Sequence, residues 1–289
     1  MKKIVLLWLT IFAIATFFVG CGKEENNTDN PSNPGEAPSY VPPARHLSKI
    51  DASLPGSELE YQFTWDGSYL TQIDVYHKAL HRLDLTYNII WDGNRVIKTI
   101  LTSPHSTNSN VTTFIYNGGQ LVKTHSTYMT SENEEMKTEV TYQYSNGMIS
   151  KIIYPEEIVG GMDVDVSWHG NNIASESMMG HQIYESIYDN KVNPLQLPVG
   201  VINYATIEGK FWEGVNHTLG YLYFLKSVKR VITAPICWSE NNIVKTVDYA
   251  GKESSVEYQY DGNYPISMTQ TYEVDDNTES VSFQFYYAN

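Results

Sequence analysis

The chain has 289 residues, a formal net charge of -14 at neutral pH and two cysteines, Cys21 and Cys237. This excess of acidic residues argues against nucleic acid as a partner, because binding to phosphates needs clustered Lys and Arg side chains. With so few cysteines the sequence excludes a disulfide framework and a thiolate metal cluster.

Residues 1–20 have the layout of a secretory signal. Lys2-Lys3 forms a basic start, Ile4 to Val19 is apolar apart from two threonines, and the small Gly20 precedes Cys21. This arrangement resembles the bacterial lipobox, and the resemblance implies that Cys21 is lipidated and becomes the mature N-terminus. The apolar run is too short and too early for a membrane span, so we expect the lipid to be the only link to the membrane.

Residues 21–45 have the composition of a disordered tether. Five prolines among many Asn, Ser and Glu residues give a segment that cannot bury enough apolar surface to fold, so we expect a semi-extended spacer. Gly22-Lys23-Glu24-Glu25 resembles the surface-export signal of Bacteroidota lipoproteins, which implies an outer-membrane lipoprotein exposed at the cell surface. A lipoprotein that faces the periplasm, with an ordinary polar tether, is the alternative.

One short pattern recurs in the remaining chain, residues 46–289, which we expect to form a single β-repeat domain. An aromatic residue is followed by turn-forming residues and then, five places later, by an aliphatic residue. The copies start 22 to 28 residues apart, apart from one gap of 70, and this is the mark of a repeated supersecondary unit. They begin at Trp65, Trp91, Tyr116, Tyr144, Trp168, Trp238 and Tyr260, the last with Pro265 in place of the aliphatic residue.

The residues before each turn alternate with period two, as in a half-buried strand. Tyr61, Phe63 and Trp65 share one face, for example, and Asp-Gly, Asn-Gly or Gly-Gly supplies the positive φ of a tight hairpin turn. About eight such hairpins predict an antiparallel β-meander of some fifteen strands with one apolar, aromatic face, most simply a curved sheet or half-barrel. Leu70 and Ile73 are an odd number of residues apart, which predicts a bulge in the returning strand.

These units resemble YD/RHS-type repeats, in which a tyrosine, a turn and a following Leu-x-x-Ile or Lys-Ile recur along a sheet. They also resemble a group of Bacteroidota surface lipoproteins of unknown function, whose later part contains Tyr-Asp-x-Lys-x-Asn-Pro. Here that element is Tyr188-Asp189-Asn190-Lys191-Val192-Asn193-Pro194. The likeness covers roughly residues 59–289. It implies a fold and a cellular location, but no activity.

An insert at about residues 188–235 interrupts the repeats. Asn216 is a candidate cap for a helix, and Trp212, Tyr221 and Tyr223 make the segment strongly aromatic. One interpretation is that this partly helical insert packs on the apolar face of the sheet and supplies half of the core. The other is that these three aromatic residues line a groove for a ligand such as a glycan.

The sequence points to no cofactor and no metal. His77 and His81 lie between strand-like segments, and Asp163 and Asp165 fall on a polar strand face. The apolar setting of Cys237 favours a buried structural thiol. A glycosidase needs two carboxylates roughly 5–10 Å apart. Glu156-Glu157 is the only conspicuous acidic cluster in the sequence, and we interpret it as a charge pair in a loop.

The sequence therefore predicts a lipid-anchored, non-enzymatic surface protein that binds an extracellular ligand, in which Cys21 is the lipidation site. Trp212, Tyr221 and Tyr223 are the candidate ligand-binding residues. A structural or partner-binding module of an outer-membrane complex is the alternative, and a polysaccharide hydrolase is a third. The sequence leaves open whether the sheet stays open, wraps the insert as a half-barrel, or closes.

Overall fold

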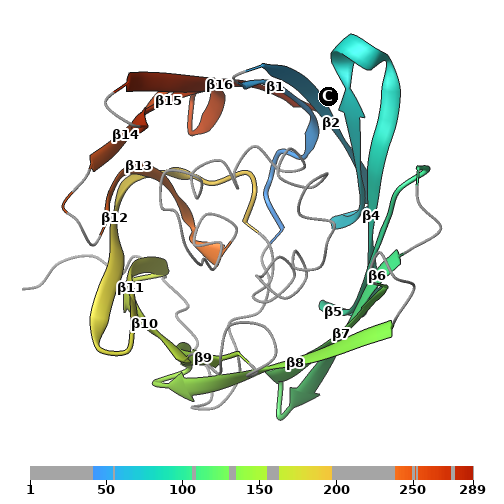
Figure 1. The fold of residues 1–289 in the computed structure, drawn as a ribbon, viewed down its shortest axis with the longest axis vertical. Coiled ribbons are helices and arrows are strands. Elements are labelled where there is room, and N and C mark those ends of the chain that lie inside the picture. The colour runs from blue at the N-terminus through green and yellow to red at the C-terminus, as the bar shows by residue number, and fades with distance from the viewer. Residues whose placement is uncertain are drawn as a thin grey trace, which may run out of the picture. The chain divides into compact units, whose positions relative to one another are not determined.

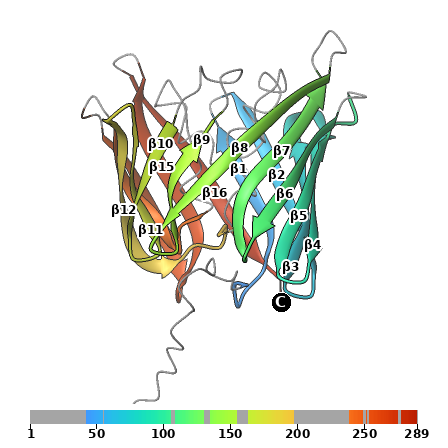
Figure 2. The ribbon, with the colours of Figure 1, turned by 90° about the horizontal axis from the view of Figure 1, so that it is seen from below.

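The computed structural model of the chain shows a closed antiparallel β-barrel of sixteen strands. The described residues are 42–54, 56–105, 109–129, 135–154, 163–196, 238–248, 251, 253–274 and 277–288. Figure 1 looks down this ring of strands, and Figure 2 shows it from the side. Among the described residues no helix has the length and apolar character to cross a membrane.

The strands follow one another with few irregularities, and a single short 3-10 helix, Lys78–Leu80, lies between the third and the fourth. The first eight are β1 Leu47–Leu54, β2 Ser57–Asp66, β3 Tyr69–His77, β4 Arg82–Asp92, β5 Arg95–Thr102, β6 Ser109–Asn117, β7 Gln120–Met129 and β8 Glu135–Ser145. The second eight are β9 Met148–Ile153, β10 Asp163–His169, β11 Asn172–Met178, β12 His181–Val192, β13 Asn241–Asp248, β14 Glu253–Asp261, β15 Tyr264–Val274 and β16 Asn277–Tyr287.

Each strand pairs with its neighbours in the sequence, and β1 also pairs with β16. The expected meander of hairpins is therefore confirmed, but the expectation of an open curved sheet or half-barrel is wrong. The first and last strands pair antiparallel from Leu47 and Tyr287 to Ser53 and Ser282, so the sheet has no free edge. The expected helix near Asn216 lies outside the described residues.

The repeated pattern corresponds to a hairpin in six of its seven copies. In each, the aromatic residue is the Cα partner of the residue five places later, as Trp65 is of Leu70 and Tyr144 is of Ile149. The turn between them has two residues, and Asn146 and Gly147 show why Asn and Gly occur there, because their φ angles are 53° and 79°. We name the end of the barrel that carries these turns the turn end.

The predicted bulge is confirmed, and it recurs in every unit. Beyond the pair of Trp65 and Leu70 the register skips Thr71, so Leu70 and Ile73 share the buried face. The Thr71 hydroxyl donates to the Thr64 carbonyl across the bulge at 3.1 Å. Shifts at the matching position occur in the hairpins that begin at Trp91, Tyr116, Tyr144, Trp168 and Tyr260.

A circle of eight aromatic residues runs around the inner wall near the turn end, one for each pair of strands. We name it the aromatic circle: Trp65, Trp91, Tyr116, Tyr144, Trp168, Tyr188, Tyr260 and Tyr287. Seven of them donate an N–H or O–H to a backbone carbonyl of the preceding unit, at 2.7 to 3.0 Å. Trp91 donates to Leu70 and Tyr116 to Val96, so each aromatic residue fastens its hairpin to the one before.

The seam between β16 and β1 repeats this unit without a covalent turn. Tyr287 pairs with Leu47, the register then skips Ser48, and the Ser48 hydroxyl donates to the Tyr286 carbonyl at 3.1 Å. Tyr287 donates to the Pro265 carbonyl, as a member of the aromatic circle. The two ends of the chain thus form an eighth hairpin-like unit, and the barrel consists of eight units.

The inner face of the wall holds the core. Buried side chains alternate along most strands, for example Leu59, Tyr61 and Phe63 on β2. In a closed sheet, the face that all strands share and that is shielded from water is the inner one. The core is not apolar throughout, contrary to expectation. Thr99, Thr112, Ser126 and Thr138 form a buried row across β5 to β8, in which Thr112 and Ser126 hydroxyls lie 2.8 Å apart.

The outer face of the wall is polar and carries ion pairs. Lys123 contacts Glu139 at 2.6 Å, Lys245 contacts Glu253 at 2.6 Å, and Arg82 contacts Asp84 at 2.7 Å. Exposed pairs of this kind contribute about 0–1 kcal/mol each to stability. They place charged side chains on the outside of the described wall.

Candidate functional site at the insert neck

The insert occupies the turn of the sixth hairpin, which is formed by β12 and β13. Tyr188 pairs with Ile243 and takes the place that Trp65 has in the first hairpin, so residues 193–240 lie where the other units have two turn residues. The prediction that Trp238 is the aromatic residue of this unit is wrong. Trp238 belongs to no strand and is buried, and the strand that pairs with β13 ends at Val192.

The two ends of the insert are hydrogen-bonded to each other, and we name the described residues 189–196 and 238–242 the insert neck. Asn193 donates its backbone N–H to the Glu240 carbonyl at 2.9 Å and its side-chain amide to the Ser239 carbonyl at 2.9 Å. Asn242 donates its side-chain amide to the Val192 carbonyl at 3.1 Å. These bonds satisfy backbone groups that have no ladder partner beyond the strands.

Asp189 is the hub of the insert neck. One of its carboxylate oxygens accepts the backbone N–H groups of Lys191 at 2.9 Å and Asn242 at 3.2 Å, and the other accepts the Tyr260 hydroxyl. Tyr260 is the one member of the aromatic circle that donates to a side chain instead of a backbone carbonyl. Burial raises the pKa of the Tyr260 hydroxyl, and the bond to Asp189 raises it further, so the hydroxyl keeps its proton.

Neighbouring units brace the insert neck on both sides. On one side, Asn172 exchanges side-chain and backbone bonds with Asn241, both at 2.9 Å, and Ser239 accepts the Ile173 backbone N–H. On the other side, the Val192 backbone N–H donates to the Asn263 carbonyl at 3.1 Å, in the turn between β14 and β15. The polar side chains of the insert neck therefore bind protein groups, and their arrangement fixes a loop in place.

The chain enters the barrel next to the insert neck. Arg45 donates to Asp261 at 3.0 Å, and its guanidinium lies 4.6 Å from the centre of the Tyr287 ring. The His46 ring stacks on Trp65 at 4.3 Å. Arg45 is the last residue of the predicted tether. Because Asp261 and Asn263 belong to the hairpin of β14 and β15, this one hairpin holds both the end of the tether and the insert neck.

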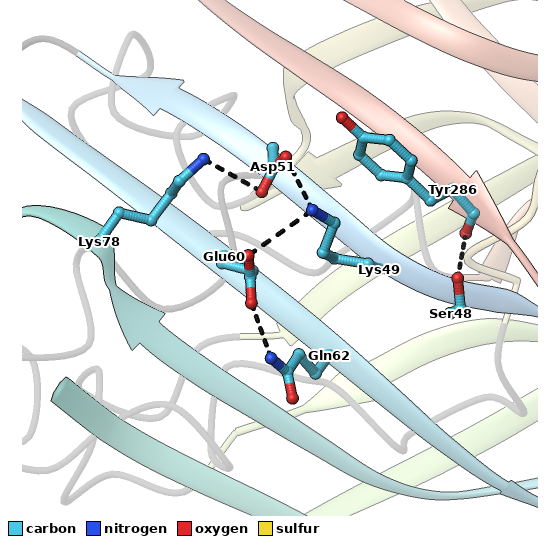
Figure 3. Close-up of polar contacts among 7 residues, drawn as sticks. All are labelled: Ser48, Lys49, Asp51, Glu60, Gln62, Lys78 and Tyr286. Atoms are coloured by element: carbon cyan, nitrogen blue, oxygen red, sulfur yellow. Dashed lines mark hydrogen bonds and ion pairs between the residues drawn. The ribbon is translucent and has the colours of Figure 1, made fainter. Parts of the chain in front are cut away.

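A second polar cluster lies on the outer wall beside the seam (Figure 3). Lys49 contacts Asp51 at 3.0 Å and Glu60 at 3.6 Å, and Lys78 contacts Asp51 at 3.3 Å. The hydrogen bond to Asp51 raises the pKa of Lys49. Partial burial acts to raise the pKa of Asp51, but its hydrogen bonds from the two lysines outweigh this effect and lower the pKa. The cluster thus holds its charges as ion pairs between β1, β2 and the short helix after β3. Lys49 also lies 4.3 Å from the centre of the Tyr286 ring.

The predicted site residues Cys21, Trp212, Tyr221 and Tyr223 all lie outside the described residues, as do Cys237 and Glu156-Glu157. The structure brings none of the candidate metal ligands together, since no group of three His, Cys, Asp or Glu residues that would hold a metal occurs in the described ranges. His77 ends β3, and His81 follows the short helix with a φ of 48°.

Asp163 and Asp165 lie on the outer face, as predicted, where both contact Lys151, at 3.2 and 3.4 Å. Trp65, Trp91 and Trp168 face inward, also as predicted, and their indole N–H groups are bound to backbone carbonyls. The insert neck was not predicted from the sequence. The signal for it is the Asn241-Asn242 pair before Ile243, together with the Asn193-Pro194 element after Tyr188.

Comparison with protein-family models and with curated proteins gave no match. Among solved structures, a porin-like protein from Bacteroides uniformis is similar over 84% of this chain and 98% of its own, at 9% identity and a TM-score of 0.50. A porin-like protein from Bacteroides vulgatus covers 84% of this chain and 99% of its own, at 12% identity and a TM-score of 0.38. The complex TcdB2-TccC3-Cdc42 covers 81% of this chain and 11% of its own, at 10% identity and a TM-score of 0.33.

The first of these likenesses shows the fold, an all-β barrel of the porin-like type. At 9% identity it says nothing about what this chain binds or does.

Proposed function

We propose that this chain is a lipid-anchored cell-surface protein of the outer membrane, without enzymatic activity, whose barrel presents the insert to an extracellular ligand such as a glycan. The insert neck carries this proposal. Side-chain and backbone hydrogen bonds from its own hairpin and from two neighbouring units hold both ends of a long, aromatic segment, and ordered loop stems lower the entropy cost of ligand binding. Trp212, Tyr221 and Tyr223 are the proposed contact residues.

The outer wall supports an anchor made of lipid instead of protein. A barrel that spans a membrane carries an apolar band about 25 Å tall on its outside, whereas the described wall here carries ion pairs on β1 and β2, on β7 to β10, and on β13 and β14. Acyl chains on Cys21 would each contribute about 0.8 kcal/mol per buried methylene, and more than one chain is needed for stable anchoring. The barrel would then stand in water at the membrane surface.

We also propose the relation to YD/RHS-type repeats and to the Bacteroidota lipoproteins that carry them. The support is that the quoted motif residues have one structural role throughout. The aromatic residue and the residue five places later are Cα partners in six hairpins, and a bulge follows each pair.

The test is a thermal-shift screen of the purified full-length protein in detergent against host and microbial glycans. A ligand at ten times its dissociation constant stabilises a protein by about 1.4 kcal/mol, which corresponds to about 3–5 °C in a domain of this size. We expect Trp212→Ala and Tyr221→Ala to abolish the shift, and Tyr76→Ala, an aromatic control on the outer wall, to retain it.

The same variants separate a binding role of the insert from a role in the core. If Trp212→Ala lowers the free energy of unfolding by about 3–5 kcal/mol, as removal of a core tryptophan does, the insert is part of the core and the binding proposal fails. No shift across the whole panel would contradict it as well.

One observation favours the alternative, a module that binds a protein partner. Ile90, Ile97, Ile187, Ile266 and Tyr286 are exposed, and all five lie on the outer wall next to a bulge near the turn end. Apolar side chains that are exposed at the same height around the barrel are better suited to contact with a protein partner than to contact with water. Crosslinking in outer membranes would test this, because Ile97→Glu should then remove a crosslinked partner, while Thr71→Glu, the same position of the first hairpin, should keep it.

A further inference from the structure

The outer surface of β14 to β16 and the end of β1 differs from the rest of the wall. Nine polar side chains without charge cover it, seven of them exposed and the other two half-buried. We name this surface the hydroxyl face, and its members are Ser53, Ser255, Gln259, Ser267, Thr269, Thr271, Ser280, Ser282 and Gln284.

The strand register arranges these side chains in rows. Ser255 pairs with Thr271, and Thr271 pairs with Ser280, so that three hydroxyls lie side by side across three strands. A second row crosses β15, β16 and β1 through Thr269, Ser282 and Ser53, and a third holds Gln259, Ser267 and Gln284. The register between β15 and β16 is unbroken here, so neighbours lie about 4.8 Å apart across strands and rows about 7 Å apart along them.

The side chains of the hydroxyl face are free to bind something else. None of them hydrogen-bonds another group among the described residues, whereas some outward side chains elsewhere are joined in pairs, such as Ser167 with Ser175 at 2.6 Å and Gln72 with Asp74 at 2.6 Å. Two carboxylates lie at this surface: Glu257 on β14 is exposed and pairs with Thr269 in the middle row, and Asp51 on β1 pairs with Gln284. The hydroxyl face is uncharged across the described positions of β15 and β16 that it includes, in a chain with a net charge of -14.

We propose that the hydroxyl face binds a neutral carbohydrate polymer. Hydroxyl and amide groups each supply a donor and an acceptor, as sugar hydroxyls do, and a surface without cations offers nothing to an anionic ligand. Single contacts of this kind are weak in water, so a repeating polymer that makes many of them at once is the occupant that gains affinity. Ile266 follows at the end of β15 and is exposed, and it offers apolar contact to a sugar ring.

This inference goes beyond the proposed function because it does not use the insert. The experiment is affinity electrophoresis of the full-length protein in detergent, through gels that contain a neutral β-glucan, a neutral mannan or the anionic polygalacturonate. We expect at least one neutral polymer to retard the protein. Thr269→Glu, which replaces the central hydroxyl of the middle row by a second carboxylate beside Glu257, should weaken retardation about tenfold in apparent affinity. Thr113→Glu, with the same change at an exposed position on β6, should leave it within about twofold.

The controls keep the two proposals apart. Retardation that Thr269→Glu removes and Trp212→Ala keeps supports the hydroxyl face, whether or not the insert binds a ligand of its own. Retardation that Thr113→Glu removes equally, retardation by polygalacturonate alone, or no retardation in any gel would overturn the inference. A change in oligomeric state with Thr269→Glu on size-exclusion chromatography would also overturn it, because the occupant would then be a second copy of the chain.

Discussion

Tyr287, the last strand residue, is the Cα partner of Leu47, the first. Tyr287 then donates its hydroxyl to the Pro265 carbonyl at 2.7 Å, and the Leu47 carbonyl accepts the Trp65 indole N–H at 2.7 Å. This pair thus links the seam into the aromatic circle on both sides. The closure of the barrel uses the interactions of an ordinary hairpin, without its turn.

Tyr287→Phe removes the hydroxyl that fastens the seam to the seventh hairpin. We expect a loss of about 1 kcal/mol in the free energy of unfolding, the net contribution of one hydrogen bond, measured by urea denaturation. Tyr286→Phe is the matched control, because the neighbouring hydroxyl lies on the outer wall, and it should stay within about 0.5 kcal/mol. An equal effect of both variants would show that the seam does not depend on this bond.

A circular permutant should fold, because the eighth unit lacks only a covalent connection. The Ala288 backbone N–H already donates to the His46 carbonyl at 2.9 Å, so a short glycine linker can join these ends. New termini between Gly118 and Gly119 open an existing turn at the surface, where such changes are tolerated best. We expect the β-sheet circular dichroism spectrum and a cooperative unfolding transition to be retained. A permutant without cooperative unfolding would contradict the model of eight equivalent units.

Asp189→Asn should destabilise the insert neck. The change removes the charge that accepts the Tyr260 hydroxyl and two backbone N–H groups, and hydrogen bonds to charged groups contribute about 1.5–3 kcal/mol each. We expect a total loss of about 2 kcal/mol in urea denaturation, in that range. Asp66→Asn, at the same position of the first hairpin, lies in an exposed turn and should cost less than about 0.5 kcal/mol.

The buried tyrosines predict a loss of stability at alkaline pH. Burial raises the pKa of Tyr116 and that of Tyr188 to about 12, against about 10 in an unfolded chain. Ionisation therefore favours the unfolded state, so their contribution is fully present below pH 10 and is lost as the pH rises from about 10 to about 12. Urea denaturation at a series of pH values measures this, and Tyr116→Phe should reduce the slope. A slope unchanged in that variant would contradict the assignment.

The hairpins, the inward aromatic residues and the bulge were predictable because each is encoded within about ten residues. The closure was not, because Leu47 and Tyr287 stand at opposite ends of the sequence and no local pattern connects them. The aromatic residue of the sixth unit was predicted wrongly for a related reason. Ile243 was correctly placed as the returning residue, but Trp238 stands five places before it by coincidence, while its partner Tyr188 precedes the insert.

The buried hydroxyl row of Thr99, Thr112, Ser126 and Thr138 shows another limit. Thr suits either face of a strand, so period two alone could not say that these residues face inward. The insert neck was missed because its Asn side chains act through contacts with distant units, such as that of Asn172 with Asn241.

The unlinked seam has a consequence for how the protein is made. β1 is synthesised before its partner β16, so fifteen strands have two open edges until β16 has been made. Open strand edges recruit other chains, and pairings this distant in sequence form slowly. A chain without β16 would keep both edges exposed, and this strand therefore decides whether a newly made molecule stays a monomer or aggregates.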